Sequence, residues 1–151
     1  MRFFLFAFLF SLPSFAANLS DAASIIDGDT VEIHGQRIRL YGIDAPESRQ
    51  TCKRNGDDWR CGKDAAFALA DKIAQKPVEC EPKGKPDRYK RTVAVCRLNG
   101  EDLNAWMVSE GWALAYRQYS LDYVPQENEA KEAKRGIWAS EFVPPWEWRR
   151  R

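Results

Sequence analysis

Residues 24–47 read SIIDGDTVEIHGQRIRLYGIDAPE, and this stretch decides the fold. Apolar and polar residues alternate on both sides of Gly35, which is typical of two strands joined by a tight turn. The first strand is expected over residues 24–34, with an interruption at its Asp-Gly-Asp. The second is expected over residues 37–43, and the proline that follows ends it because proline has no backbone N–H to donate to a sheet.

The rest of the chain alternates between short strands and helices. Apolar residues recur at helical spacing in residues 63–76. The further elements expected are strands at residues 78–81 and 92–97 and helices at residues 102–109 and 122–135, with Gly136 as the C-terminal cap of the last helix. The polar residues 48–60 and 82–91 are expected to be loops. Few helices and several short strands predict an α+β fold with a small closed sheet.

The N-terminus has the features of a secretory signal peptide, expected over residues 1–16. A positive start precedes an apolar run, and Ser14-Phe15-Ala16 places small residues where a signal peptidase recognises them. The run is shorter than the roughly 20 residues of a membrane-spanning helix. We expect a periplasmic or secreted protein, monomeric and without stable membrane association once the leader is removed. Behind the leader we expect a linker at residues 17–23, one domain at residues 24–139 and a tail at residues 140–151.

Four cysteines follow the leader, and an even count in an exported chain indicates two disulfides. Of the three possible pairings, Cys52–Cys61 and Cys80–Cys96 are favoured. The first closes a short polar loop, and the second joins two expected neighbouring strands. A zinc site is the alternative. It is disfavoured because the chain has no C-x-x-C pair and its single histidine, His34, lies far away in sequence.

Charge and histidine content narrow the possible chemistry. The formal net charge is +1 and becomes zero when Arg2 is removed with the leader. Overall neutrality is not typical of a nucleic-acid binder, so the placement of charge has to decide. His34 lies in an expected turn, which argues against a Ser-His-Asp triad, and no P-loop is present. The candidates that remain are carboxylates, arginines and a metal ion.

These groups concentrate around the expected hairpin. If Gly35 reverses the chain, Asp29 and Asp44 converge, and a hard cation such as calcium relieves the repulsion between two carboxylates. Arg39 and Arg91 are suited to binding a phosphate through paired hydrogen bonds. Glu47 is a candidate for orienting or deprotonating an attacking water. Together the residues predict phosphodiester cleavage.

A purely structural interpretation also accounts for these observations. Asp27-Gly28 is a common turn dipeptide. Arg39 and Asp44 are compatible with an ordinary surface ion pair, and the basic residues 82–91 with a solvated loop.

The motifs resemble those of one family. Residues 26–31, IDGDTV, followed by residues 39–47, RLYGIDAPE, are similar to the signature of the staphylococcal nuclease (thermonuclease) family. Residues 87–91, DRYKR, resemble the family's segment that ends in a catalytic arginine. Residues 104–113 and 136–138 resemble its later helices. The resemblance covers about residues 24–138.

The resemblance implies a fold and an activity. The fold would be a five-stranded OB-type β-barrel with three helices. The activity would be calcium-dependent hydrolysis of DNA and RNA that leaves 3′-phosphate products. The alternative is an OB-type nucleic-acid-binding module with weak or lost catalysis.

The resemblance also implies a role for each site residue. Calcium would be held by the carboxylates of Asp29 and Asp44 and by the backbone carbonyl of Ala45, where the family often has threonine. Arg39 and Arg91 would bind phosphate, and Glu47 would act on the water. The loop after Glu47 looks longer than in the family and cross-linked.

Aromatic residues extend the expected site. Tyr89, Tyr116 and Tyr119 are candidates for stacking on nucleic-acid bases, with core packing as the alternative. In the tail, Trp146 and Trp148 either cover an open barrel edge or belong to a disordered segment. The three arginines at residues 149–151 either add affinity for polyanions or keep the tail soluble.

Overall fold

The computed structural model describes residues 17–151, and the expected signal peptide, residues 1–16, lies outside the described residues. The strands are β1 (Leu19–Asp21), β2 (Ser24–Asp27), β3 (Thr30–Ile33), β4 (Gln36–Leu40), β5 (Ile43–Asp44), β6 (Cys52–Arg54), β7 (Asp57–Trp59), β8 (Val78–Pro82), β9 (Thr92–Leu98), β10 (Glu101–Asp102) and β11 (Leu114–Ala115). The helices are α1 (Cys61–Ile73), α2 (Leu103–Ser109), α3 (Val124–Glu132), the 3₁₀ helix η1 (Gly136–Ala139) and α4 (Pro145–Trp148).

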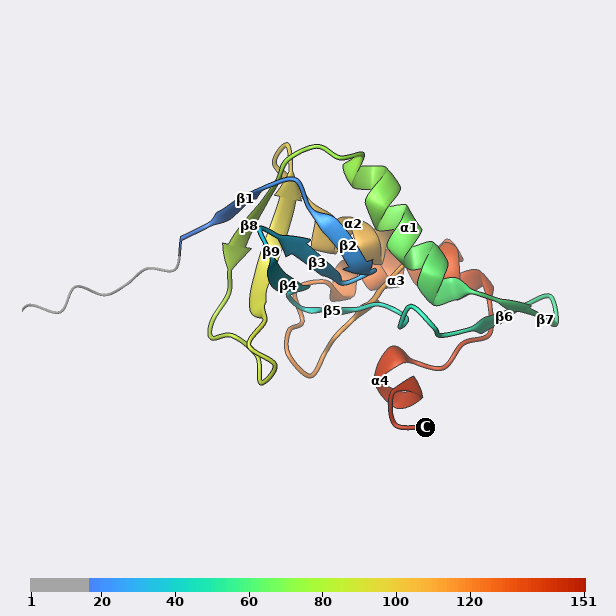
Figure 1. Ribbon diagram of the computed structural model, residues 1–151. Helices are drawn as coiled ribbons and strands as arrows, with labels where there is room; N and C mark the ends of the chain where they lie inside the picture. Colours follow the sequence, from blue (N-terminus) through green and yellow to red (C-terminus); the bar gives the residue numbers. More distant parts are fainter. Residues whose placement is uncertain (1–16) are drawn as a thin grey trace, which may run out of the picture.

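One curled sheet forms the centre of the fold. Its strands are hydrogen-bonded in the order β1-β8-β9-β4-β3-β2, and β10 pairs with β9. β4 and β9 run parallel, whereas the other neighbouring strands of this sheet are antiparallel. Figure 1 shows the sheet curling, with α1 along one side and α2 and α3 beside it. The α+β class with an OB-type half-barrel is confirmed, although short extra strands and α4 exceed the five strands and three helices expected.

The β3–β4 hairpin has the predicted turn. His34 and Gly35 lie at its tip with φ of 51° and 73°. Positive φ at both central residues is the type I′ geometry, whose twist matches that of paired strands. The turn sets a register in which Thr30 lies opposite Arg39. The residues that precede β3 and those that end β4 therefore meet at one end of the hairpin.

The predicted strand at residues 37–43 is divided in two. β4 ends at Leu40, and β5 leaves the main sheet to pair with β11. Gly42 lies between them at φ +74°, a left-handed conformation that glycine adopts without strain. A β-carbon there would also lie 3.0 Å from the ring of Tyr123. The resulting kink places Asp44 beside the hairpin end instead of farther along the sheet.

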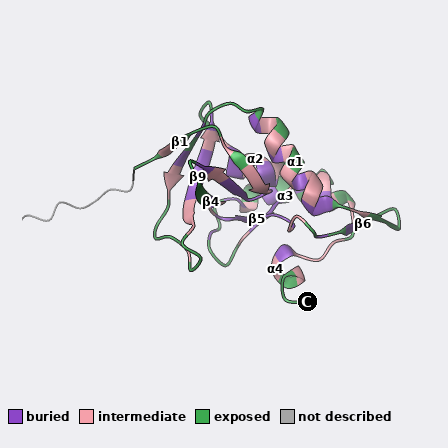
Figure 2. Ribbon diagram, viewed as in Figure 1, coloured by how far each residue is buried: buried purple, intermediate pink, exposed green. Residues whose placement is uncertain are grey.

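Helix α1 covers an open side of the sheet. Ala65, Leu69 and Ile73 on its inner face are fully buried, whereas Phe67 on its outer face is exposed. Figure 2 shows buried residues alternating along α1 with residues of intermediate burial and a few exposed ones. Full burial of a side chain such as Leu69 or Ile73 stabilises the fold by about 1.5–3 kcal/mol. The helix therefore anchors the loop that precedes it.

Two helices end earlier than predicted. α1 ends at Ile73 instead of residue 76, because Ala74 and Gln75 take positive φ values. α3 ends at Glu132 with Ala133 as its C-cap, and Gly136 begins η1, so the expectation that Gly136 caps this helix is wrong. Among residues 17–151, no helix combines the length and apolar character needed to cross a bilayer.

The loop expected at residues 48–60 contains a hairpin, so that expectation is wrong. β6 and β7 pair antiparallel around Asn55 and Gly56, which have φ of 52° and 82°. Asn-Gly is the strongest short hairpin signal, and here it decides the local structure. The Cys52–Cys61 disulfide joins this hairpin to the start of α1, and the Cys80–Cys96 disulfide crosses the β8–β9 pair, as the favoured pairing predicted.

Both ends of the described chain dock on the domain. β1, in the segment expected as a linker, pairs with β8 at the edge of the sheet. In the segment expected as a tail, the backbone groups of Glu141 and Lys53 exchange two hydrogen bonds of 2.8 Å each. α4 follows below β5 (Figure 1). Both segments are therefore attached to the domain by backbone hydrogen bonds, which the side-chain pattern of these residues did not predict.

Asn104 is a buried polar link between α2 and the sheet. Its side-chain amide donates to the carbonyls of Tyr41 and Ala94 at 2.9 and 3.1 Å, and its Oδ1 accepts from the N–H of Cys96 at 3.2 Å. The residue is fully buried. These bonds fix the end of β4 against β9, close to the kink.

We expect Asn104→Ala to lower the free energy of unfolding by roughly 2–4 kcal/mol, because it leaves buried backbone groups without partners. Urea denaturation measures this change. Asn128→Ala, at an exposed position of α3, is the matched control and should stay within about 0.5 kcal/mol of the parent protein. Similar losses in the two variants would contradict the role given to Asn104.

Candidate active site

A cleft of about 1260 Å³ opens where the hairpin end, the 82–91 connector and the C-terminal segment meet. Its lining is acidic, basic and aromatic. The predicted site residues that line it are Asp29, Arg39, Glu47, Tyr89, Arg91, Tyr116 and Tyr119. Asp44 is fully buried and lies against this lining through its contact with Arg39.

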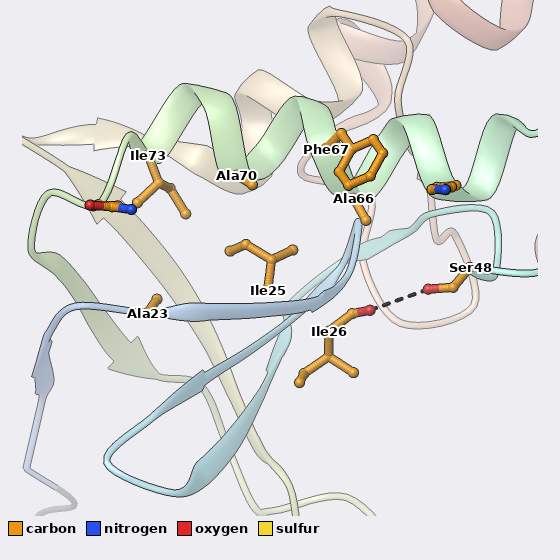
Figure 3. Close-up of a pocket in the computed structure, with 10 residues that line it drawn as sticks. Ala23, Ile25, Ile26, Ser48, Ala66, Phe67, Ala70 and Ile73 are labelled. Carbon is orange, nitrogen blue, oxygen red and sulfur yellow. Dashed lines mark hydrogen bonds between the residues drawn. The ribbon is translucent and has the colours of Figure 1, made fainter.

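A second hollow of about 450 Å³ lies between α1 and β2. Figure 3 shows it as an apolar groove lined by residues such as Ile25, Ala66 and Phe67. Lys63 is its one charged lining residue, so it does not bring together groups able to act on a phosphodiester. At its edge, Ser48 donates to the carbonyl of Ile26 at 3.2 Å, which ties the loop after β5 to β2.

Asp29 and Asp44 lie side by side at the end of the hairpin. Their side chains are 8% and 0% exposed. One nitrogen of Arg39, Nη2, lies 3.4 Å from Asp29 Oδ2 and 3.2 Å from Asp44 Oδ1. Asp29 also accepts hydrogen bonds from the Thr30 hydroxyl at 3.0 Å and from the N–H of Ala45 at 2.7 Å. The convergence expected from the hairpin pattern is present in the structure.

Arg39 is held by backbone as well as by carboxylates. Its Nη1 donates to the carbonyls of Leu40 and Ile43 at 3.0 and 2.9 Å, on either side of the kink between β4 and β5. Its side chain is 15% exposed. The kink therefore supplies acceptors that orient the guanidinium toward the acidic pair and the cleft.

The environment of Asp44 makes its carboxyl harder to ionise than an ordinary aspartate. Burial, reinforced by the nearby negative charge of Asp29, raises the pKa of Asp44 from 3.8 to about 6. A hydrogen bond from Arg149 and the charges of Arg39 and Arg149 act in the opposite direction but do not outweigh the burial.

Glu47 is positioned by a tight backbone turn. Its carbonyl accepts from the N–H of Gln50 at 2.7 Å, and its N–H donates to the side-chain oxygen of Gln50 at 3.3 Å. Gln50 is buried, and its amide donates to the carbonyl of Val143 at 2.7 Å. The first turn of α1 packs directly against the Glu47 backbone, since a β-carbon on Gly62 would lie only 1.6 Å from the Glu47 carbonyl oxygen.

Arg149 enters the acidic site from the C-terminal segment. Its two terminal nitrogens, Nη1 and Nη2, each lie 2.9 Å from an oxygen of Asp44, and Nη1 also lies 2.8 Å from Glu47 Oε1. Burial alone would lower the pKa of Arg149, but its bonds to Asp44 and Glu47 outweigh that effect and raise it. Arg149 is therefore a constituent of the site, a role that neither interpretation of the tail had given it.

Arg91 lies in the same cleft but outside the acidic cluster. Its Nε pairs with Asp87 Oδ2 at 2.7 Å, and its N–H donates to Asp87 Oδ1 at 2.9 Å. Although burial alone would raise the pKa of Asp87, the hydrogen bonds from Arg91 and Tyr89 lower it below its usual range. The ring of Tyr89, which is 64% exposed, lies 5.4 Å from the Arg91 guanidinium. Asp87 thus orients Arg91 at the rim.

Aromatic rings form one wall of the cleft. Tyr116 and Tyr119 stack with ring centroids 4.8 Å apart, and Trp146 of α4 lies 5.6 Å from Tyr116. Tyr119 is 65% exposed. The core-packing alternative is wrong for Tyr119 and Tyr89, because both side chains are largely exposed to solvent. The alternative of a disordered tail is wrong for Trp146, which packs on this wall.

The acidic cluster offers hard oxygen ligands. Within residues 17–151, no three His, Cys, Asp or Glu side chains form a metal-binding group. The expected calcium set contains only two carboxylates plus the Ala45 carbonyl, with water completing the shell that calcium prefers. Asp29 and Asp44 already share one cationic nitrogen of Arg39, and Asp44 and Glu47 share another from Arg149. The oxygens are of the chemical type that a hard cation prefers, and in this structure arginine side chains occupy them.

Three contributors to the site escaped the sequence analysis. Asp87 had a signal, because it lies four residues before Arg91 on a connector where a carboxylate can pair with that arginine. Gln50 and Arg149 act across 93 and 105 residues of chain. A local sequence pattern cannot predict contacts between residues so far apart in the chain.

Comparison with known proteins gives a family match over residues 37–140, to the family described as "Staphylococcal nuclease homologue". The "Succinoglycan biosynthesis protein ExoI" of Rhizobium meliloti is 42% identical over 123 residues, which cover 79% of this chain and 64% of that protein. An "Uncharacterized endonuclease" of Escherichia coli O157:H7 is 35% identical over 153 residues, covering 95% of this chain and 94% of that protein.

A third similar protein is the "Micrococcal nuclease" of Shigella flexneri, 34% identical over 158 residues that cover 93% of this chain and 85% of that protein. The chain thus spans less than two thirds of the first of these relatives and most of the other two.

In the metal-free protein we expect the Asp44 carboxyl to titrate near pH 6 instead of 3.8. The folded state then holds this proton more tightly than the unfolded chain does. The contribution of Asp44 to stability is therefore complete below about pH 4 and is lost as the pH rises through about 6. Carbon-13 NMR of the carboxyl, assigned with Asp44→Asn, measures the midpoint.

Arg149→Ala serves as the internal comparison for this titration. It removes a hydrogen bond that lowers the Asp44 pKa, so the midpoint should rise further. A midpoint near the ordinary aspartate value in the parent protein would show that burial does not control this group.

Proposed function

The chain belongs to the staphylococcal nuclease homologue family, and from that premise we propose that it is an exported, calcium-dependent nuclease that hydrolyses phosphodiester bonds of DNA and RNA. One observation carries the proposal beyond family membership. Arg39 contacts Asp29 and Asp44, and Arg149 joins Asp44 to Glu47, so these residues form one network at the edge of a cleft that also contains Arg91. Acids, arginines and an open cleft are the parts that phosphodiester hydrolysis needs.

The two arginines would bind the scissile phosphate. Both arginines line the cleft. Arg39 is oriented by Asp44 and by backbone carbonyls, and Arg91 is oriented by Asp87, which also accepts from the Arg91 backbone N–H. Guanidinium groups held in advance stabilise negative charge that builds on phosphoryl oxygens during attack. Removing one such donor typically slows an enzyme by about 100-fold or more.

Glu47 would act on the water. Its carboxylate is 31% exposed at the cleft edge, and its backbone is fixed by Gln50. From there it would accept the proton of a water whose oxygen attacks phosphorus, while the bond from phosphorus to the 5′ oxygen breaks. The expected product carries a 3′-phosphate.

Asp29, Asp44 and the carbonyl of Ala45 would hold calcium. When bound, the cation would neutralise charge on the phosphate and polarise a phosphoryl oxygen. The exposed rings of Tyr89 and Tyr119, with Tyr116 beneath, would stack on bases without selecting a sequence. Stacking of this kind is compatible with both DNA and RNA.

Export is supported by the cysteine chemistry. Two disulfides are typical of an oxidising compartment, in agreement with the signal peptide expected at residues 1–16. We propose a periplasmic or secreted protein that acts as a monomer and has no stable membrane association.

The proposal is tested with the oxidised, mature protein on single-stranded DNA, double-stranded DNA and RNA. We expect cleavage with calcium, none after chelation, and 3′-phosphate ends. Arg39→Ala and Glu47→Gln should each reduce the rate by about 100-fold or more, because each removes a group that contacts the reacting phosphate or water.

Arg37→Ala is the matched control for Arg39→Ala. Arg37 lies on the same strand, but its exposed side chain pairs with Glu32 away from the cleft, so cleavage should be unchanged. Full activity of both site variants would refute the assignment. Tight DNA binding without turnover in any divalent cation would support a binding module instead.

A further inference from the structure

The guanidinium of Arg149 occupies the acidic cluster. It binds Asp44 through two parallel hydrogen bonds of 2.9 Å, the forked geometry in which arginine pairs most strongly with a carboxylate. The same side chain reaches Glu47 at 2.8 Å. A single cation thus bridges one expected metal ligand and the expected water-activating residue.

These contacts use the oxygen atoms that a metal ion would need. Asp44 Oδ1 accepts from Arg39 and Arg149, Oδ2 accepts from Arg149, and the side chain has no exposed surface. A cation that binds Asp44 therefore has to take an oxygen that Arg149 now holds. Two positive charges a few ångströms apart also repel each other, so simultaneous occupancy is disfavoured.

The segment that carries Arg149 is attached to the domain close to the acidic cluster. Before α4, the chain is tied to the domain by the Glu141–Lys53 backbone pair and by the bond from Gln50 to the Val143 carbonyl. Beyond Val143, Pro145 is buried, and Trp146 packs on the hydrophobic cluster of the domain and against Tyr116. Arg149 follows these apolar contacts and reaches the acidic cluster through its side chain. Releasing the guanidinium therefore requires movement of the Arg149 side chain and the residues after α4, and it leaves the apolar contacts of Pro145 and Trp146 in place.

We propose that Arg149 is the resident cation of the acidic site in the metal-free protein, and that calcium and Arg149 exclude each other at Asp44. The inference rests on the proposed function for the identity of the metal. In the closed arrangement Arg149 neutralises the carboxylates and holds Glu47 away from a water. Calcium displaces Arg149 and in doing so frees Glu47. The C-terminal segment is thereby an autoinhibitory strap that the cofactor opens.

Calorimetric titration of the full-length, oxidised, metal-free mature protein with calcium tests the exclusion directly. Arg149→Ala should bind calcium about tenfold more tightly than the parent protein, because the competing cation is gone. Arg149→Lys keeps the charge but loses the fork, so its affinity should fall between the two. Arg151→Ala removes the same charge two residues away, where the structure gives the side chain no ion pair or hydrogen bond, and should stay within about twofold.

The outcomes separate this inference from the proposed function. Tighter binding in Arg149→Ala supports the exclusion, including the case in which the parent protein shows no measurable calcium binding. Equal or weaker binding in Arg149→Ala overturns it, even if the same preparation cleaves DNA with calcium. If no variant binds calcium, the exclusion is overturned, and the cleavage assay then decides the nuclease assignment by itself.

Discussion

Two carboxylates, Asp29 and Asp44, are buried next to each other, and the surrounding structure compensates for the resulting repulsion. Burial and mutual proximity both disfavour two negative charges in one place. Arg39 lies between the two carboxylates and pairs with both. Asp29 also accepts hydrogen bonds from the N–H of Ala45 and the hydroxyl of Thr30, and Asp44 pairs with Arg149. β4 carries Arg39, the residue after β5 supplies the N–H of Ala45, and the C-terminal segment carries Arg149, so these three parts of the chain bring the donors to the two carboxylates.

Backbone geometry provides most of that positioning. The type I′ turn at Gly35 brings the two hairpin ends together, and the kink at Gly42 offers two carbonyls to Arg39. The Cys52–Cys61 disulfide ties the β6–β7 hairpin to the start of α1, and just before this hairpin Gln50 joins the Glu47 turn to the C-terminal segment. The acidic site is therefore assembled by turns and backbone hydrogen bonds that a survey of charged residues overlooks.

The sequence was most informative where the determining contacts are local. The alternation around Gly35 predicted the hairpin, and the hairpin placed Asp29 near Asp44. Asn55-Gly56 carried an equally strong turn signal, but the charged residues around it favoured a loop interpretation. Arg149 and Gln50 had no such signal, because their partners are about a hundred residues away and depend on how the whole chain packs. For the same reason, α4 could not be predicted from a tail rich in proline, tryptophan and arginine.

The close contact between Gly62 and the carbonyl of Glu47 affects how substitution data on this protein should be interpreted. In a saturation mutagenesis screen scored by activity, any side chain at position 62 would displace the Glu47 backbone. The resulting pattern of intolerance would look like that of a reactive residue, although glycine contributes no functional group. Separate measurements of protein abundance and substrate affinity would distinguish a residue that takes part in the reaction from a glycine that only leaves space for the Glu47 backbone.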